Sequence, residues 1–219
     1  MQSSIQHIIA NNTFWLSPQR CIYWEEEKAL ILSDLHFGKT GHFRKNGIAV
    51  PQHIYKEDLQ RLIEQVVHFN PKKIIAVGDL FHSKENKELE LFAKWRNDFH
   101  AIDFILVKGN HDILPPSWYE QKNLTVKEGF YQINEFGFVH DPNEFNMAET
   151  AVKYSFSGHL HPAVSMKGLG KQQLSFPCFH FTKKNAVLPA FSKFSGHSII
   201  KPKKGDLVFM LVNERIVPL

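Results

Sequence analysis

An alternation of short apolar runs with amphipathic segments in the first half of the chain is the strongest constraint on its fold. Apolar runs at residues 29–33, 74–77 and 102–107 have the length of buried strands. Between them, residues 52–69 and 88–99 carry large apolar side chains at the spacing of an amphipathic helix. Strand, helix, strand, helix, strand is the order of an α/β sheet, so we expect this class in the first half.

A β-rich run at residues 20–24 is separated from residues 29–33 by the acidic turn 25–27, which indicates a hairpin in the first half of the chain.

The second half of the chain is predicted to be mostly β-sheet. Further β-like runs, punctuated by glycine and proline, lie at residues 136–139, 154–157, 174–181, 186–188 and 207–212. With 219 residues, no internal repeat and no convincing linker, the chain is expected to form a single domain over residues 1–219.

The composition favours a folded, cytoplasmic protein of moderate charge. Hydrophobic residues make up 43% and charged residues 22%, unlike the composition of disordered chains. The sequence has no run of about 18 apolar residues and no basic start followed by an apolar stretch, so we expect neither membrane insertion nor secretion. Cys21 and Cys178 are too few for a disulfide framework and are expected to be free and buried. A formal charge of +4 suits an anionic substrate but does not single out nucleic acid.

The run at residues 29–33 is followed by Asp34 and His36, two candidate metal ligands. If the strand continues, its period-two alternation points both side chains to the same side, where a carboxylate oxygen and an imidazole nitrogen can bind one cation. Taken alone, an Asp-x-His sequence is more often part of a surface loop, so a metal site needs further ligands.

Similar polar residues follow the other predicted strands. Asp79 and Asn110, each preceded by glycine, follow the next two runs, and strand carboxyl ends are where open α/β sheets build their sites. His140 follows the run at 136–139, and His159 and His161 are again separated by one residue. The candidate metal ligands are therefore Asp34, His36, Asp79, Asn110, His140, His159 and His161. Oxygen and imidazole ligands without a thiolate fit two divalent cations better than one structural zinc.

These motifs, in this order, resemble those of the calcineurin-like metallophosphoesterases. The matching segments are Asp34-Leu35-His36, Gly78-Asp79, Gly109-Asn110-His111-Asp112, His140 and Gly158-His159-Leu160-His161. The resemblance implies an α/β (α+β) metallophosphoesterase fold, a four-layer αββα sandwich of two mixed β-sheets flanked by helices. It implies one metal bound by Asp34, His36, Asp79 and His161. It implies a second metal bound by Asp79, Asn110, His140 and His159, with Asp79 bridging the two.

A narrower resemblance points to the bacterial metallophosphoesterases associated with DNA ligase and a large helicase, the PdeM-like group. It rests on Gly38-Lys39, His42-Phe43-Arg44, Gly47-Ile48-Ala49-Val50-Pro51 and Val187-Leu188-Pro189-Ala190-Phe191. This group implies a manganese-dependent DNA endonuclease or phosphodiesterase of DNA repair, with a DNA ligase and a helicase as partners. Ser195-Gly196-His197 stands where the group usually has a glycine pair, which leaves the role of that loop open.

We therefore expect a binuclear enzyme that hydrolyses a phosphodiester by attack of a metal-activated water. Its cofactors would be two divalent ions, manganese first, with iron or zinc as alternatives. His111 is the candidate catalytic residue, because it can stabilise charge on the phosphate or protonate the leaving oxygen. Arg44 is the candidate substrate-binding residue, although a solvated basic loop explains it equally well. Asp112 either orients His111 or caps the turn.

Several alternatives remain open on the sequence. The substrate is a phosphodiester such as DNA, a cyclic nucleotide or a small phosphoester, because the metal ligands do not discriminate among them. A non-catalytic scaffold of the same fold is less favoured, since such a protein has no need of every ligand. A nuclease that depends on a partner protein is a further alternative. The sequence does not determine the oligomeric state.

Overall fold

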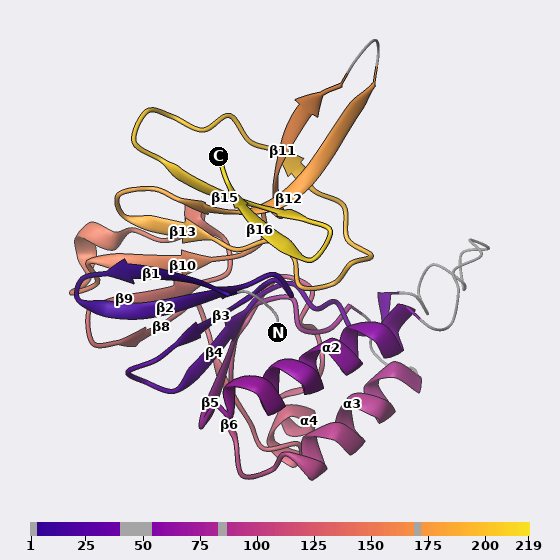
Figure 1. The fold of residues 1–219 in the computed structure, drawn as a ribbon. Helices are drawn as coiled ribbons and strands as arrows, with labels where there is room; N and C mark the ends of the chain where they lie inside the picture. Colours follow the sequence, from indigo (N-terminus) through magenta and orange to yellow (C-terminus); the bar gives the residue numbers. More distant parts are fainter. Residues whose placement is uncertain (1–3, 40–53, 83–86, 169–171) are drawn as a thin grey trace.

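Two β-sheets face each other in the computed structural model, and helices cover the first of them (Figure 1). The structure describes residues 4–39, 54–82, 87–168 and 172–219. The first sheet contains, in spatial order, β1 (Ile5–Ile9), β2 (Asn12–Ser17), β3 (Cys21–Trp24), β4 (Ala29–Leu32), β5 (Lys73–Val77), β6 (Asp103–Val107) and β7 (Leu124–Lys127). Strands β1 to β4 are antiparallel, whereas β4 to β7 are parallel. Helices α2 (Ile54–Phe69), α3 (Lys87–Asp98) and α4 (Pro116–Gln121) lie in the parallel crossovers.

The second sheet is also mixed. Its order is β14 (Ser198–Ile199), β11 (Pro162–Lys167), β12 (Gln173–Phe181), β13 (Asn185–Val187), β10 (Tyr154–Ser157), β9 (Phe136–Val139) and β8 (Phe130–Ile133). In addition, β15 (Leu207–Val212) pairs with β12, and β16 (Arg215–Pro218) pairs with β15. Strand β10 has a neighbour on each side, β9 and β13, so it lies inside the sheet rather than at an edge. Because both neighbours are parallel to β10, the carboxyl ends of the three strands lie at the same end of the sheet.

Strand β12 changes partners at Pro177. Up to this residue it pairs with β11, in the register Ala163↔Pro177, and from Cys178 onward it pairs with β15. Proline has no amide hydrogen for a ladder, so it fits a point where one pairing ends and another begins. Strand β11 and the first part of β12 extend away from the sheet as a two-stranded arm (Figure 1).

Strand β4 is buried on both faces and separates two cores. Leu30 faces the helices, and Ile31 faces the second sheet, as strand alternation requires. The core between the sheets is rich in aromatic rings. Phe14 of the first sheet lies 5.0 Å from Phe156 of the second and 5.4 Å from Trp24, measured between ring centroids. These contacts fix the distance between the sheets whose loops form the site.

The helices α2, α3 and α4 pack on the outer face of the first sheet through Leu62, Phe92 and Tyr119. On the outer face of the second sheet, a methyl group built on Gly137 would lie 2.9 Å from Val152, so the chain passes directly over β9. Between β9 and β10 run two short 3-10 helices, η1 (Pro142–Glu144) and η2 (Met147–Glu149). The expected sandwich of two mixed sheets flanked by helices is confirmed. In the described part of the chain, the layer outside the second sheet contains 3-10 helices and no α-helix.

Most predicted elements are present, with ends that differ slightly. The predicted hairpin forms between β3 and β4, in the register Ile22↔Ile31. Strands β1, β2, β7, β8, β11, β14 and β16 and helix α4 were not predicted from the sequence. In β1 every residue is exposed or half-buried, so the strand lacks the apolar signal of a core element. Cys21 and Cys178 are free and buried, as expected. None of the described helices is long and apolar enough to cross a membrane. The single-domain expectation stays a prediction.

Candidate metal centre

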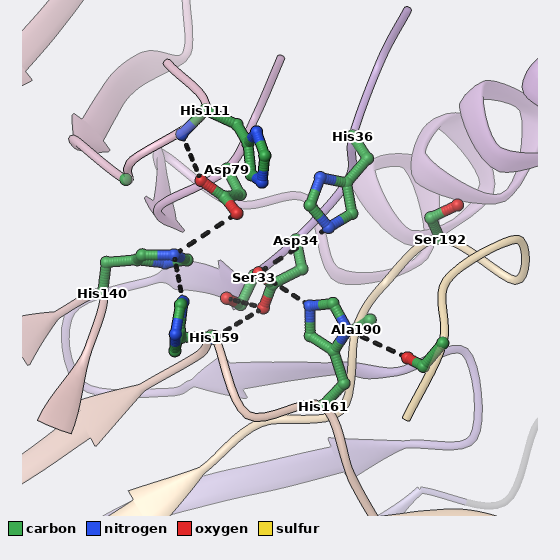
Figure 2. Close-up of polar contacts among 12 residues, drawn as sticks. Ser33, Asp34, His36, Asp79, His111, His140, His159, His161, Ala190 and Ser192 are labelled. Carbon is green, nitrogen blue, oxygen red and sulfur yellow. Dashed lines mark hydrogen bonds and ion pairs between the residues drawn. The ribbon is translucent and has the colours of Figure 1, made fainter. Parts of the chain in front are cut away.

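The loops that follow β4, β5, β9 and β10 bring their polar side chains together between the two sheets (Figure 2). Asp34 and Asp79 come from the first sheet, and His140, His159 and His161 come from the second. All of these residues follow the carboxyl ends of their strands, and backbone hydrogen bonds such as that from His36 to Asp79, 2.9 Å long, hold the loops together. Two sheets are thus needed to assemble one cluster.

Asp34, His36 and His161 form a first group, in which one ligand atom of each lies within 4.8 Å of the others. His161 Nε2 lies 3.0 Å from Asp34 Oδ1, and His36 Nε2 lies 4.0 Å from the same oxygen. Asp34 is completely buried, and His36 is nearly so. The sequence prediction that Asp34 and His36 lie close together is therefore confirmed.

Asp34, Asp79 and His140 form a second group within the same limit. His140 Nε2 lies 3.4 Å from Asp79 Oδ2, and His159 Nδ1 lies 3.2 Å from His140 Nε2. Asn110 lines a pocket of about 320 Å³ together with His140 and His159. All seven predicted ligands thus lie in or beside one cluster. Asp34 belongs to both groups, whereas the resemblance placed Asp79 between the metals, and the assignment of ligands to individual metals stays a prediction.

Four ligand atoms are buried without a hydrogen-bond partner among the described residues. They are Asp34 Oδ1, His161 Nε2 and both ring nitrogens of His36; Asp34 Oδ1 and His161 Nε2 touch without hydrogen-bond geometry. Buried polar atoms are nearly always hydrogen-bonded, and leaving one unpaired costs roughly 1–3 kcal/mol. A divalent cation would satisfy the oxygen and the imidazole lone pairs together. The residues present therefore fit a metal.

Hydrogen bonds to backbone carbonyls orient two of the histidines. His140 Nδ1 lies 3.1 Å from the carbonyl of Val77, and His161 Nδ1 lies 2.9 Å from the carbonyl of Gly196. Because a carbonyl only accepts, each Nδ1 must carry the hydrogen, which leaves Nε2 to face the carboxylates. This arrangement, with one ring nitrogen held by a carbonyl, is typical of metal-binding histidines.

Burial and charge shift the titration of these groups in opposite directions. Burial lowers the pKa of His36 to about 3, so its ring is neutral and its lone pair is free. For Asp79, burial opposes ionisation, but the interactions with His140 and the amide of His111 outweigh it and lower the pKa to about 2. For His140, burial opposes protonation, but Asp79 and Asp34 outweigh it and raise the pKa to about 9. Asp79 and His140 thus form an ionised pair that a cation would have to open.

Comparisons with known proteins agree with this geometry. The calcineurin-like phosphoesterase family matches residues 28–150, more than half of the chain. The chain belongs to this family. No curated protein matches the chain. Family membership supports a hydrolase of phosphoesters.

A solved structure shares the fold of this phosphoesterase. The nuclease MPE of Pseudomonas putida superposes with a TM-score of 0.83 at 23% identity, covering 99% of this chain and 100% of that chain. The phosphoesterase Yfce of E. coli superposes with a TM-score of 0.44 at 15% identity, covering 84% of this chain and 88% of that chain. A protein of unknown function from Aquifex aeolicus superposes with a TM-score of 0.44 at 15% identity, covering 65% of this chain and 82% of that chain. At these identities the first likeness establishes the fold alone, and the other two add nothing to it.

The backbone that presents the ligands is not the extended strand that the sequence predicted. Strand β4 ends at Leu32, and Asp34 and His36 both have left-handed backbone angles, with φ of 55° and 51°. The same holds after β10, where φ is 65° at His159 and 45° at His161. The prediction that strand alternation aligns these pairs was therefore wrong. In each pair, two left-handed residues flank one residue without this conformation, and both side chains of the pair point into the cluster. Left-handed angles strain the backbone of residues other than glycine, and such strain is often found at functional sites.

Glycines let the loops of the phosphoesterase approach the ligands. A methyl group on Gly158 would lie 1.7 Å from Ser33 Oγ and 2.6 Å from Asp34 Oδ2. A methyl group on Gly109 would lie 2.3 Å from Asp79 Oδ1. Neither contact is sterically allowed, so any larger residue must push a candidate ligand aside. The sequence showed these glycines as turn signals, but it could not show which carboxylates they touch.

His111 lies beside the cluster through both its backbone and its ring. Its amide donates a hydrogen bond of 2.9 Å to Asp79 Oδ1. The centroid of its imidazole lies 5.8 Å from the centroid of the His36 ring and 4.3 Å from that of the His82 ring. Figure 2 shows His111 beside Asp79 and His36. The predicted catalytic residue therefore lies at the edge of the cluster of candidate ligands, and its catalytic role stays a prediction.

Asp112 has the turn-capping role that the sequence gave as one of two alternatives. Its carboxylate accepts hydrogen bonds of 2.9 Å from the amides of Phe81 and Gly109, and burial raises its pKa to about 7. It thus joins the loops after β5 and β6.

Arg44, the predicted substrate-binding residue, lies outside the described residues and stays a prediction. Ser33 was missed, although it directly precedes Asp34 and donates a 2.5 Å hydrogen bond to it.

We expect Gly158→Ala to weaken metal binding, because the added methyl group displaces Ser33 and Asp34. Isothermal titration with Mn²⁺ should show a loss of affinity of at least about tenfold, in the range seen when groups supporting a metal ligand are lost. Gly168→Ala is the matched control, since its methyl group would meet Gln172 at an ordinary 3.5 Å. Equal Mn²⁺ affinity in both variants would show that the close approach of Gly158 is not needed.

We expect metal uptake to release protons at neutral pH. In protein stripped of metal, His140 is protonated below its pKa of about 9, so a cation must displace that proton. Affinity should therefore rise with pH up to that value, by about tenfold for each pH unit and proton released. Mn²⁺ titration in buffers of different ionisation enthalpy measures the proton count. Zero proton release at neutral pH would contradict the protonated state of His140.

Proposed function

We propose that this phosphoesterase is a metal-dependent phosphodiesterase that hydrolyses nucleic acid, with DNA as the first candidate substrate. The observation that carries the proposal is a convergence of buried atoms beside the ionised pair of Asp79 and His140. These atoms belong to Asp34, His36 and His161 and have no hydrogen-bond partner in the part of the chain that the structure describes. Burying carboxylate and imidazole atoms without partners costs free energy, and a bound cation would offset this cost.

The proposed metal ligands are those of the cluster. Asp34, His36, Asp79, Asn110, His140, His159 and His161 would hold two divalent ions, with manganese as the first candidate and iron or zinc as alternatives. When bound, two such ions would neutralise phosphate charge and lower the pKa of a water molecule enough for it to attack phosphorus near neutral pH.

His111 would act on the leaving group. The hydrogen bond from its amide to Asp79 fixes the position of its backbone relative to the cluster. Its ring contacts the rings of His36 and His82, which limits its rotation and leaves it facing the site. From there, the imidazole can donate a proton to the oxygen that leaves phosphorus or a hydrogen bond to the phosphate. It is therefore proposed as the catalytic residue.

Two observations support nucleic acid as the substrate class. The structural likeness to a nuclease and the net positive charge both favour it. A role in DNA repair with a DNA ligase and a helicase is part of the proposal and rests on the sequence resemblance. The cytoplasmic location stays a prediction.

Hydrolysis of two p-nitrophenyl substrates tests the proposed function. We expect Mn²⁺-dependent cleavage of the diester bis-p-nitrophenyl phosphate by the wild type and a loss of cleavage in Asp79→Ala. The exposed residue Asp98, at the end of α3, gives the matched control Asp98→Ala, which should keep activity. Cleavage of the monoester p-nitrophenyl phosphate alone would indicate a phosphatase. Cleavage of neither substrate would favour the non-catalytic scaffold or a nuclease that requires a partner.

The role of His111 is tested separately. We expect His111→Gln to lower kcat by roughly 100- to 10,000-fold, the usual contribution of a general acid. Metal content, measured by elemental analysis, should stay that of the wild type, because the backbone amide that holds Asp79 is kept. The exposed residue His100 provides the control His100→Gln. Loss of metal from His111→Gln would instead assign a structural role to this side chain.

A further inference from the structure

A second pocket, of about 280 Å³, adjoins the metal cluster on the side of His161. It lies between the base of the β11–β12 arm and the segment 190–197, and its lining includes Arg20, His161, Lys193, Ser195 and His197. We call it the Arg20 pocket. Because His161 lines this pocket and also contacts Asp34, the pocket is continuous with the proposed reaction site.

The Arg20 pocket is basic, whereas the pocket on the other side of the cluster is not. Arg20 and Lys193 supply cationic groups, and no carboxylate is among the described residues of the lining. The carboxylate of Glu214 lies outside the lining, with Oε1 3.9 Å from Lys193 Nζ. The opposite pocket, next to His140, is lined by Glu128, Asp141 and Glu144. The two sides of the cluster thus differ in charge. In a substrate with more than one phosphate, electrostatic attraction favours binding of the additional phosphate on the Arg20 side.

Arg20 is held in place for binding. Both hydrogen bonds recorded for its guanidinium among the described residues use Nη1, which donates to the carbonyls of Ala190 at 3.2 Å and Ser192 at 3.0 Å. Its remaining N–H groups make no hydrogen bond to the described residues, so a ligand can accept from them. Burial lowers its pKa to about 10, so it stays charged at neutral pH. Its backbone is left-handed, with φ of 67°, a conformation that long side chains rarely adopt.

Ser195 adds an unsatisfied hydroxyl to the same pocket. Its Oγ is buried and has no hydrogen-bond partner among the described residues. A hydroxyl beside a fixed guanidinium and a lysine can donate to a phosphate oxygen, as side chains commonly do at nucleic-acid backbones. The pocket therefore combines charge, fixed donors and one unpaired polar group.

We propose that the Arg20 pocket is a subsite for a second phosphate group of the substrate, next to the phosphodiester that is cleaved. This inference rests on the proposed function and defines its substrate class as an oligonucleotide rather than an isolated diester. The neighbouring phosphate binds Arg20, Lys193 and Ser195 while the scissile phosphate lies at the metal cluster. On the acidic side of the cluster, the substrate presents sugar and base rather than phosphate.

Matched substrates test the subsite. The first pair is the p-nitrophenyl ester of thymidine 5′-phosphate without and with a phosphate on the 3′-hydroxyl. The second pair is the p-nitrophenyl ester of thymidine 3′-phosphate without and with a phosphate on the 5′-hydroxyl. We expect the wild type to have a higher kcat/KM on the doubly phosphorylated substrate in one of these pairs, the one that places the second phosphate in the subsite. In Lys193→Ala/His197→Ala this preference should fall by about tenfold, as when a charge-assisted contact is lost.

Lys204→Ala/Lys183→Ala is the matched control for removed charge, because both lysines line a separate pocket that shares no residue with the Arg20 pocket. The control should keep the preference of the wild type. A preference that is absent from the wild type, or is unchanged in Lys193→Ala/His197→Ala, would overturn the subsite.

Direct binding separates the subsite from the proposed function. Titration of the wild type with thymidine 3′,5′-bisphosphate in the presence of Mn²⁺ should give a Kd that rises about tenfold in Lys193→Ala/His197→Ala. If this dependence is found but no ester is hydrolysed, the proposed function fails and the phosphate subsite stands. If esters are hydrolysed but binding is the same in both proteins, the subsite fails and the phosphodiesterase stands.

Discussion

The carboxylate of Asp34 is buried between the two sheets, and its hydrogen bonds join them. Oδ2 accepts a hydrogen bond from Ser33 on its own sheet and another, of 3.1 Å, from the amide of His159 on the second sheet. Its backbone amide and carbonyl bond to Gly78 and Ser192. A buried carboxylate is stable only with such partners, so the sheets must keep this relative position. The same position creates the metal cluster, because Oδ1 is left facing His36 and His161.

Much of the cluster could be predicted from the sequence, because each ligand follows an apolar run that is long enough to be recognised. Asp34, Asp79 and His140 lie where the strand ends indicated, and the α/β order of the first half is correct. The reason given for the pairing of Asp34 with His36 was wrong, since left-handed backbone angles leave no trace in the hydrophobic pattern. The same limit applies to Ser33 and Gly158, whose contact joins residues far apart in the chain.

The parts of the fold that were missed share a physical cause. Strand β1 has no fully buried residue, and β11 is buried only in its first three residues, so neither has the burial of a full core strand. Arg20 was also missed, because nothing in the sequence around a turn shows that its guanidinium reaches the carbonyls of Ala190 and Ser192. Sequence patterns report burial along one element, whereas the Arg20 pocket depends on four separate segments.

The separation of Asp34 and His159 by 125 positions has a consequence for how the protein matures. During synthesis, the first sheet can form with its helices before the chain has reached His159 and His161, but the binding site cannot yet exist. Ion capture is therefore a late step that follows docking of the second sheet. A bound cation would interact with side chains from both sheets. It would therefore stabilise the folded protein after the sheets have docked and make their separation less favourable.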